Sequence, residues 1–302
     1  YNLGLNFRKS GVTRKGAESF TAVQFGKDPV FRSELFLPFD ARQISFFKPY
    51  FQFGQKSFNH VVNNHIESRY NIEKLIFGAA LGLEFSNLGI FSVGAEEQRG
   101  NIETYIGPDS ETFHFKDIVH YFLFEYDSLD NLNFPGAGSL IRLRYDKIRP
   151  KQRMVEDFAV TSSYLLKGFN IGRNKFIFKG EMIRSIHQIS GRHFQQSLGG
   201  LLRLSGPHDD SLVGNSSLYT SVTWLRRLTR QSILPVDFPV YGGIALEAGN
   251  VWDRTADMSS HDLLYGATLL LAVDSPLGPV YLGYGRTENE FSAYYIKLGR
   301  IF

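Results

Sequence analysis

The sequence predicts an all-β fold, a 16-stranded antiparallel transmembrane β-barrel with a long inward-folding loop. Apolar residues alternate with small or polar residues in many segments of about ten residues, as in strands that face lipid on one side and a wet lumen on the other. No run of about eighteen apolar residues is present, so a membrane-spanning helix is not expected. The 302 residues also include 27 Phe, 15 Tyr and 29 Gly, which suits aromatic girdles and small inward-facing positions.

The alternation is clearest in the last forty residues, 263–302. Leu269 and its alternate neighbours form an apolar face, while Thr268 lies on the opposite, small or polar face, where Leu270 is the exception. A charge at Leu269 should therefore meet lipid, and a charge at Thr268 should be tolerated in the lumen. The chain stops on Phe302 in register with the apolar face, so we expect the last strand to form the barrel seam.

The remaining strands follow at a regular pace. Lys175, Lys179 and Glu181 share one strand face, which favours a wet interior over a packed sandwich core. Sixteen strands are expected, an even number as in closed single-chain barrels, and weak alternation within 45–100 leaves about fourteen to eighteen open. The expected strands are 1–9, 16–26, 29–38, 45–54, 58–70, 73–86, 88–99, 113–127, 137–147, 153–166, 174–186, 214–228, 239–252, 262–274, 278–287 and 290–302.

No linker or low-complexity tract divides the chain, so residues 1–302 are expected to form one barrel domain. The chain opens at Tyr1 inside a strand-like pattern, without an initiator Met or a signal-peptide pattern. We therefore expect a fragment or processed product with further residues upstream.

One connection, of almost thirty residues between the strands 174–186 and 214–228, is much longer than the others. It contains Gly199, Gly200 and Gly206 around a group of leucines, which would allow tight turns and close backbone contact. The leucines are Leu198, Leu201, Leu202 and Leu204. The composition leaves two alternatives open: the loop folds back into the lumen, or it is a plain extracellular loop.

Four segments resemble the BamA-type outer-membrane barrel superfamily, and most of all the patatin-like autotransporters of the PlpD kind (type Vd secretion). Residues 198–206 resemble the conserved sixth extracellular loop, and 126–138 resemble the strand–turn–strand segment with its Phe-Pro-x-x-Gly turn. Residues 245–252 resemble the inward-facing acid-x-Gly motif of strand thirteen, and 274–302 resemble the closing strands. The residues that the resemblance singles out are Phe134, Pro135 and Gly138 in the turn, Glu247 and Gly249 in the strand motif, and Tyr294, Ile296, Leu298 and Phe302 in the assembly signal.

The resemblance implies that the loop is tethered to Glu247 inside the lumen, and the chain departs from the family at this point. Where relatives have arginine before the loop glycine, this sequence has Ser205 before Gly206, and Arg203 is the only nearby cation. We expect Arg203 or Ser205 to lie within hydrogen-bond reach of Glu247. The alternative is that Glu247 is an ordinary solvated lumen carboxylate.

The sequence contains no evident catalytic or metal-binding motif. Cys is absent, G-x-S-x-G and H-E-x-x-H do not occur, and a net charge of +3 does not argue for nucleic acid. No catalytic residue, metal or cofactor is therefore expected in this chain. Glu96 and Glu97 are interpreted as a solvated rim at a strand end, and the histidines as lumen or loop residues.

The resemblance implies a bacterial outer-membrane barrel that secretes or displays its own N-terminal lipase, with a patatin-like domain and a POTRA domain upstream. Its implied partners are outer-membrane lipids, the barrel assembly machinery and that N-terminal domain as cargo; homodimerisation is left open. The alternatives are a BamA- or TamA-like insertase and, less favoured, a passive porin. Gly4 in the first strand and Gly299 in the last predict a weakly paired seam, which the resemblance implies can open laterally. The alternative is an ordinary closed seam.

Overall fold

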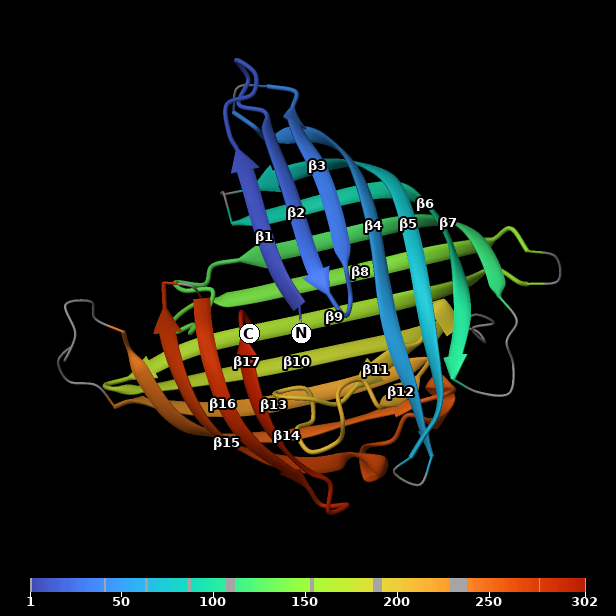
Figure 1. Ribbon diagram of the computed structural model, residues 1–302. Coiled ribbons are helices and arrows are strands. Elements are labelled where there is room, and N and C mark those ends of the chain that lie inside the picture. The colour runs from blue at the N-terminus through green and yellow to red at the C-terminus, as the bar shows by residue number, and fades with distance from the viewer. Residues whose placement is uncertain are drawn as a thin grey trace. The chain divides into compact units, whose positions relative to one another are not determined.

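A computed structural model describes residues 2–40, 42–62, 65–85, 88–106, 112–152, 155–186, 192–228, 238–276 and 278–301. Fifteen strands form one antiparallel sheet in which each is hydrogen-bonded to its sequence neighbours, and β11 and β12 form a separate pair (Figure 1). The sheet strands are β1 (Asn2–Lys9), β2 (Glu18–Gly26), β3 (Val30–Pro38), β4 (Ser45–Val62), β5 (His65–Phe85), β6 (Gly89–Ile106), β7 (Phe113–Asp127), β8 (Ser139–Pro150), β9 (Phe158–Ile171), β10 (Asn174–Ile186), β13 (Ser216–Arg227), β14 (Val240–Trp252), β15 (Leu264–Ser275), β16 (Gly278–Thr287) and β17 (Ser292–Leu298).

The all-β prediction is confirmed, because the only helical elements in the described ranges are three short 3-10 turns. These are η1 (Arg192–Phe194), η2 (Thr255–Asp257) and η3 (Ser260–Asp262). Within the described ranges, no helix has the length and apolar character needed to cross a membrane. The predicted weak seam between the first and last strands stays a prediction.

The prediction of three strands within 45–86 is wrong, because this region forms the two long strands β4 and β5. Polar side chains at Gln55, Lys56 and Ser57 interrupt the sequence alternation, which suggested a break there. The backbone nevertheless continues, since Gln55 pairs with Glu73 and Ser57 with Asn71 in an unbroken register. Backbone ladder hydrogen bonds do not depend on side-chain polarity. The described sheet accordingly has fifteen strands where sixteen were expected.

The chain divides into two compact units, and the strands β7 to β10 contribute residues to both. Unit 1 contains Tyr1–Glu125, Leu143–Thr161 and Ser185–Phe194, and unit 2 contains Tyr126–Arg142, Ser162–Arg184 and Gln195–Phe302. Each unit is described by itself below.

The inner face of unit 1 carries a polar network centred on Glu96 of β6. The Glu96 carboxylate accepts hydrogen bonds from Tyr50 Oη at 2.5 Å, Gln98 Nε2 at 2.6 Å and Arg144 Nη2 at 3.1 Å. The interpretation of Glu96 as a solvated strand end is therefore wrong, because it is buried in the middle of its strand. Glu97 faces the other way and forms ion pairs with Arg99 and Lys116.

The inner face of unit 2 carries an apolar core beside buried polar side chains such as Lys179 and Thr223. Its core contains Phe134, Leu140, Leu166, Ile177, Leu201, Leu202, Leu225, Tyr241, Ala245, Leu270, Ala272 and Tyr281. Leu270, the exception in the β15 alternation, is buried in this core, whereas its neighbour Leu269 is 58 % exposed on the outer face. The inner face of β15 is thus apolar at this point because another segment of the chain packs on it.

Candidate functional site

The segment that packs on the inner face of β15 is the long connection between β10 and β13. Its described part contains η1, then β11 (Gln196–Leu198) and β12 (Leu212–Gly214), which pair antiparallel as a small hairpin. The tip of this hairpin, 199–211, lies against the inner face of unit 2 (Figure 1). All four leucines predicted to pack inward are buried. We call residues 196–214 the docked loop.

The carboxylate of Glu247 on β14 binds the tip of the docked loop. Glu247 is 3 % exposed. Its Oε2 accepts the backbone N–H groups of Leu204 at 2.8 Å and Ser205 at 3.1 Å, and its Oε1 accepts the Ser205 hydroxyl at 2.7 Å. Charge-assisted hydrogen bonds of this kind are the strong ones in proteins. We call this arrangement the Glu247 clip.

The two strands beside β14 complete the clip. Tyr219 of β13 donates to Oε2 at 3.0 Å, and Thr268 of β15 donates to Oε1 at 2.5 Å. The carboxylate therefore has five donors, and its charge is balanced by hydrogen bonds instead of by a cation. Thr268 is itself buried, so the prediction that it tolerates an arginine has to be revised.

Arg203 makes no hydrogen bond to Glu247, although it was one of the two expected partners. Its Nη2 donates to the Ser197 carbonyl at 3.0 Å and lies 3.7 Å from the Glu181 carboxylate of β10. The backbone explains this: the Arg203 carbonyl accepts the Gly199 N–H and its own N–H donates to Gly200, which closes a tight turn over β11. Ser205 is the residue that reaches Glu247.

Two leucines beside the clip have left-handed backbone conformations. The φ angle is 54° at Leu202 and 70° at Leu204. A residue with a Cβ is strained in this region by about 1–3 kcal/mol and keeps this conformation only where its surroundings hold it there. Here the Leu202 N–H donates to the Ser205 hydroxyl at 2.9 Å, and the Leu204 N–H donates to Glu247.

Glycines in β16 and in the loop make room for this close approach. A Cβ added to Gly285 would lie 2.3 Å from Ser205 Cβ, and one added to Gly283 would lie 2.6 Å from Leu201 Cδ1. Gly206 has φ +133°, and its N–H donates to the Tyr295 hydroxyl of β17 at 2.9 Å. Gly249, the glycine of the acid-x-Gly motif, lies instead against the β13 backbone, where a Cβ would meet Leu218 O at 2.8 Å.

The turn at 126–138 also packs on the inner face of unit 2. Phe134 is 1 % exposed, and its ring lies 4.8 Å from the ring of Tyr241 and 5.6 Å from that of Tyr281. Gly138 has φ +88°, and a Cβ there would lie 2.0 Å from Ser128 O. Pro135 fits against Gly168, where a Cβ would approach it within 2.7 Å. The structure thus gives each of the three predicted turn residues a packing or conformational role.

Asp130 fixes the shape of the turn. Burial works against ionisation of its carboxyl, but Oδ1 accepts the N–H groups of Gly136 at 2.8 Å and Ala137 at 2.9 Å. These hydrogen bonds favour the ionised form and hold the pKa of Asp130 below its ordinary value.

The predicted assembly-signal residues lie on the outer face of β17. Tyr294 is 86 % exposed and its ring lies 4.8 Å from that of Tyr284, while Ile296 and Leu298 are also exposed. Phe302, like Tyr1, falls outside the described residues.

Sequence reasoning missed Tyr219, Thr268 and Tyr295 as members of the site. The available signal was their inward parity on strands beside Glu247 or at the closing edge. No group of three or more His, Asp or Glu side chains that could hold a metal occurs within the described residues. The geometry shows how a loop is held on the inner face of unit 2.

Comparison with solved structures places this fold beside known barrels, although no protein-family model and no curated protein matches the chain. BamA from Haemophilus ducreyi lacking POTRA domains 1–3 matches with a TM-score of 0.75 and 13% identity, over 98% of this chain and 66% of that chain. CdiB from Escherichia coli matches with a TM-score of 0.63 and 15% identity, over 99% and 57%. CdiB from Acinetobacter baumannii gives 0.60 and 11%, over 98% and 59%.

The chain therefore has the fold of the BamA and CdiB barrels, which confirms the BamA-type fold that the sequence resemblance implied. It spans between 57% and 66% of the length of the three matched chains.

Proposed function

We propose that this chain is a bacterial outer-membrane barrel that translocates polypeptide or inserts it into the membrane, with the docked loop as its regulating element. The Glu247 clip is the observation that carries the proposal. Release of the Glu247 clip would give the loop an undocked arrangement besides the docked one, and a two-state element of this kind is what a gated route needs.

The outward side chains support the membrane location. They are apolar and exposed in both units, and such a large apolar surface is poorly suited to water. Examples are Leu81, Phe77 and Val93 in unit 1 and Leu246, Leu269 and Leu282 in unit 2.

A passive porin agrees less well with the structure. The docked loop and the 126–138 turn cover the inner face of unit 2 with apolar side chains such as Leu201 and Phe134. A channel for small solutes would instead keep a polar, water-filled interior.

More narrowly, we propose that the barrel belongs to a patatin-like autotransporter and displays its own N-terminal lipase. In the full-length protein that lipase would precede the barrel, as the resemblance implies. The support is the pair of segments 126–138 and 198–206. The barrel itself then has no catalytic role. An insertase is the second candidate, favoured by the TM-score with BamA, the highest of the three comparisons.

The test uses the full-length protein in cells, with an epitope on its N-terminal domain. We compare Glu247→Ala with Glu288→Ala, a matched change at an exposed carboxylate. The autotransporter proposal expects Glu247→Ala to reduce epitope exposure on intact cells while the barrel stays in the outer membrane. An epitope that never reaches the surface, together with impaired assembly of other barrels on depletion, would establish the insertase instead. If neither transport nor assembly depends on the protein, the proposed function is wrong.

A further inference from the structure

The start of the long connection is held separately, within unit 1. His193 of η1 is buried with its Nε2 2.8 Å from Oδ2 of Asp117 on β7. An ionised carboxylate can only accept, so Nε2 carries the proton of the neutral imidazole and Nδ1 is the site for a second proton.

Aromatic packing and one lysine fix the position of this pair. The His193 ring stacks on Phe115 of β7 at 3.8 Å with an interplanar angle of 10°, and Phe194 meets Phe158 of β9 edge-on at 5.1 Å. Lys74 of β5 donates to the His193 carbonyl at 3.3 Å, and its Nζ lies 5.3 Å from the Phe194 ring centroid. Three strands of unit 1 thus hold two consecutive residues of the connection.

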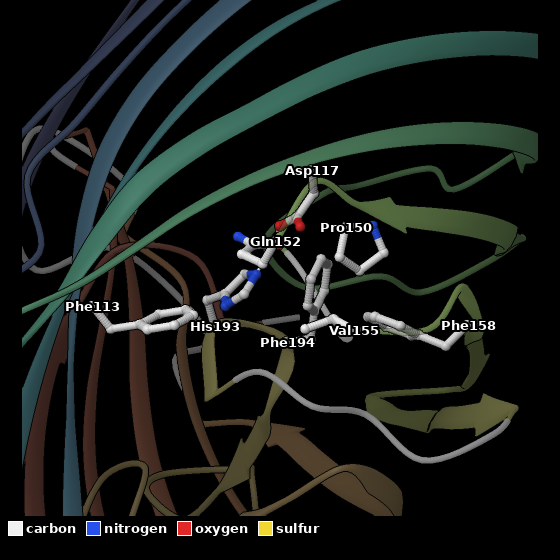
Figure 2. A pocket seen from close by; sticks show the side chains of 8 residues that line it. All are labelled: Phe113, Asp117, Pro150, Gln152, Val155, Phe158, His193 and Phe194. Atoms are coloured by element: carbon white, nitrogen blue, oxygen red, sulfur yellow. Dashed lines mark hydrogen bonds and ion pairs between the residues drawn. The ribbon is translucent and has the colours of Figure 1, made fainter.

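The imidazole of His193 also lines a small cavity, drawn in Figure 2. The cavity has a volume of about 10 Å³, which is room for about one water molecule. Three buried polar atoms of residues that line it have no hydrogen-bond partner in the described protein: His193 Nδ1, Asp117 Oδ1 and Gln152 Nε2. The rest of its lining is Phe113, Pro150, Val155, Phe158 and Phe194.

We propose that His193 and Asp117 form an acid-sensitive latch, which fixes the start of the long connection to β7 and opens when His193 takes up a proton on Nδ1. The regulatory role of the latch rests on the proposed function, which the latch would control. The latch itself is a property of unit 1. It is distinct from the Glu247 clip in residues and in chemistry.

The charges around the imidazole set the direction of the effect. Asp117 favours the protonated ring and Lys74 opposes it. A second cavity that His193 lines within unit 1 has Asp28, Lys56 and Lys74 among its lining residues. Burial lowers the pKa of His193 below its ordinary value, and the hydrogen bond with Asp117 offsets only part of this. A released imidazole ionises near pH 6.5, so the latch is fully stabilised above about that pH and weakens as the pH falls toward the pKa of the docked ring.

The test measures hydrogen exchange by mass spectrometry on the full chain in lipid nanodiscs, corrected for the intrinsic pH dependence of exchange. From pH 7.5 to 5.0 we expect exchange in the peptide 192–198 to rise, since the pKa of the docked ring lies below that of the released ring. Residues 199–206, held by the clip, should keep their protection. His193→Gln should abolish the rise, and His208→Gln, at an exposed histidine of the same loop, should leave it intact.

The latch is refuted if the wild-type peptide shows no rise, or if His193→Gln still shows it. If His193→Gln does not fold, Asp117→Asn decides the matter. Losing the carboxylate charge should move the midpoint of the rise to lower pH, and an unchanged midpoint would overturn the proposal. The readout does not involve transport, so the latch and the proposed function can fail independently.

Discussion

Glu247→Ala should release the docked loop, and the free energy of docking that is lost follows from the five donors of the clip. The substitution leaves two backbone N–H groups and three hydroxyls buried without their acceptor. Each unsatisfied group costs roughly 1–3 kcal/mol, but hydroxyls rotate and water can enter the site. Because these costs are not additive, we expect a loss of about 3–5 kcal/mol for the set, as when one partner of a buried charged pair is removed.

Glu247→Gln should be milder, because the two carboxylate oxygens have different partners. Both donors at Oε1 are hydroxyls, of Ser205 and Thr268, which can turn and accept from an amide N–H. The donors at Oε2 include two backbone N–H groups, which need an oxygen there. We expect Gln to orient its amide nitrogen toward the hydroxyls and to cost less than Ala.

Tryptic cleavage after Arg203 at pH 8 measures both variants, because the bond beside Leu204 is accessible only when the tip is released. The expected loss corresponds to about two to four powers of ten in the open population, limited by the rate for an unstructured peptide. The order should be Glu247→Ala, then Glu247→Gln, then wild type, with Glu288→Ala equal to wild type. Wild-type cleavage kinetics in Glu247→Ala would show that the clip does not hold the loop.

Three further predictions concern the face assignment, the fit of the loop and the turn. Leu269→Arg should cost about 2–4 kcal/mol if the residue lies near the bilayer midplane, seen as a lower melting temperature in a heat-modifiability gel; no shift would contradict the outward assignment. Gly285→Ala should displace Ser205 and speed cleavage after Arg203, whereas Gly4→Ala, whose Cβ has no neighbour closer than 3.8 Å, should not. The turn should lose stability below about pH 4. The ionised carboxylate of Asp130, whose pKa is depressed, stabilises the turn fully only above that value. In the wild type, hydrogen exchange of 128–138 should increase below that pH. If the same increase persists in Asp130→Asn, a group other than Asp130 causes it.

Residues whose environment depends on strand parity could be predicted from the sequence. The alternation assigned Leu269 and Tyr294 to the outside and Glu247 to the inside, and the structure agrees in each case. Parity is a local property of an extended chain, so it needs no knowledge of distant contacts. The glycine- and leucine-rich composition of the docked loop is also local information, and it raised inward folding as one of two alternatives.

Residues whose role depends on distant partners could not be predicted in this way. Glu96 is buried because Tyr50, forty-six positions earlier, and Arg144, forty-eight positions later, meet it on the inner face. Arg203 points away from Glu247 because the turn around it contains leucines with positive φ, a conformation that a leucine-rich sequence gives no reason to expect. The uninterrupted β4 and β5 depend on backbone pairing, which side-chain alternation only partly reports.

The left-handed backbone at Leu202 and Leu204 stores conformational strain in the docked loop. Two strained residues hold a reserve of about 2–6 kcal/mol that the clip and the buried leucine side chains must continuously oppose. Once the carboxylate lets go, both residues relax to ordinary angles, and re-docking has to rebuild the strain along with the hydrogen bonds. The strain therefore offsets part of the free energy that the hydrogen bonds and the buried leucines contribute to docking.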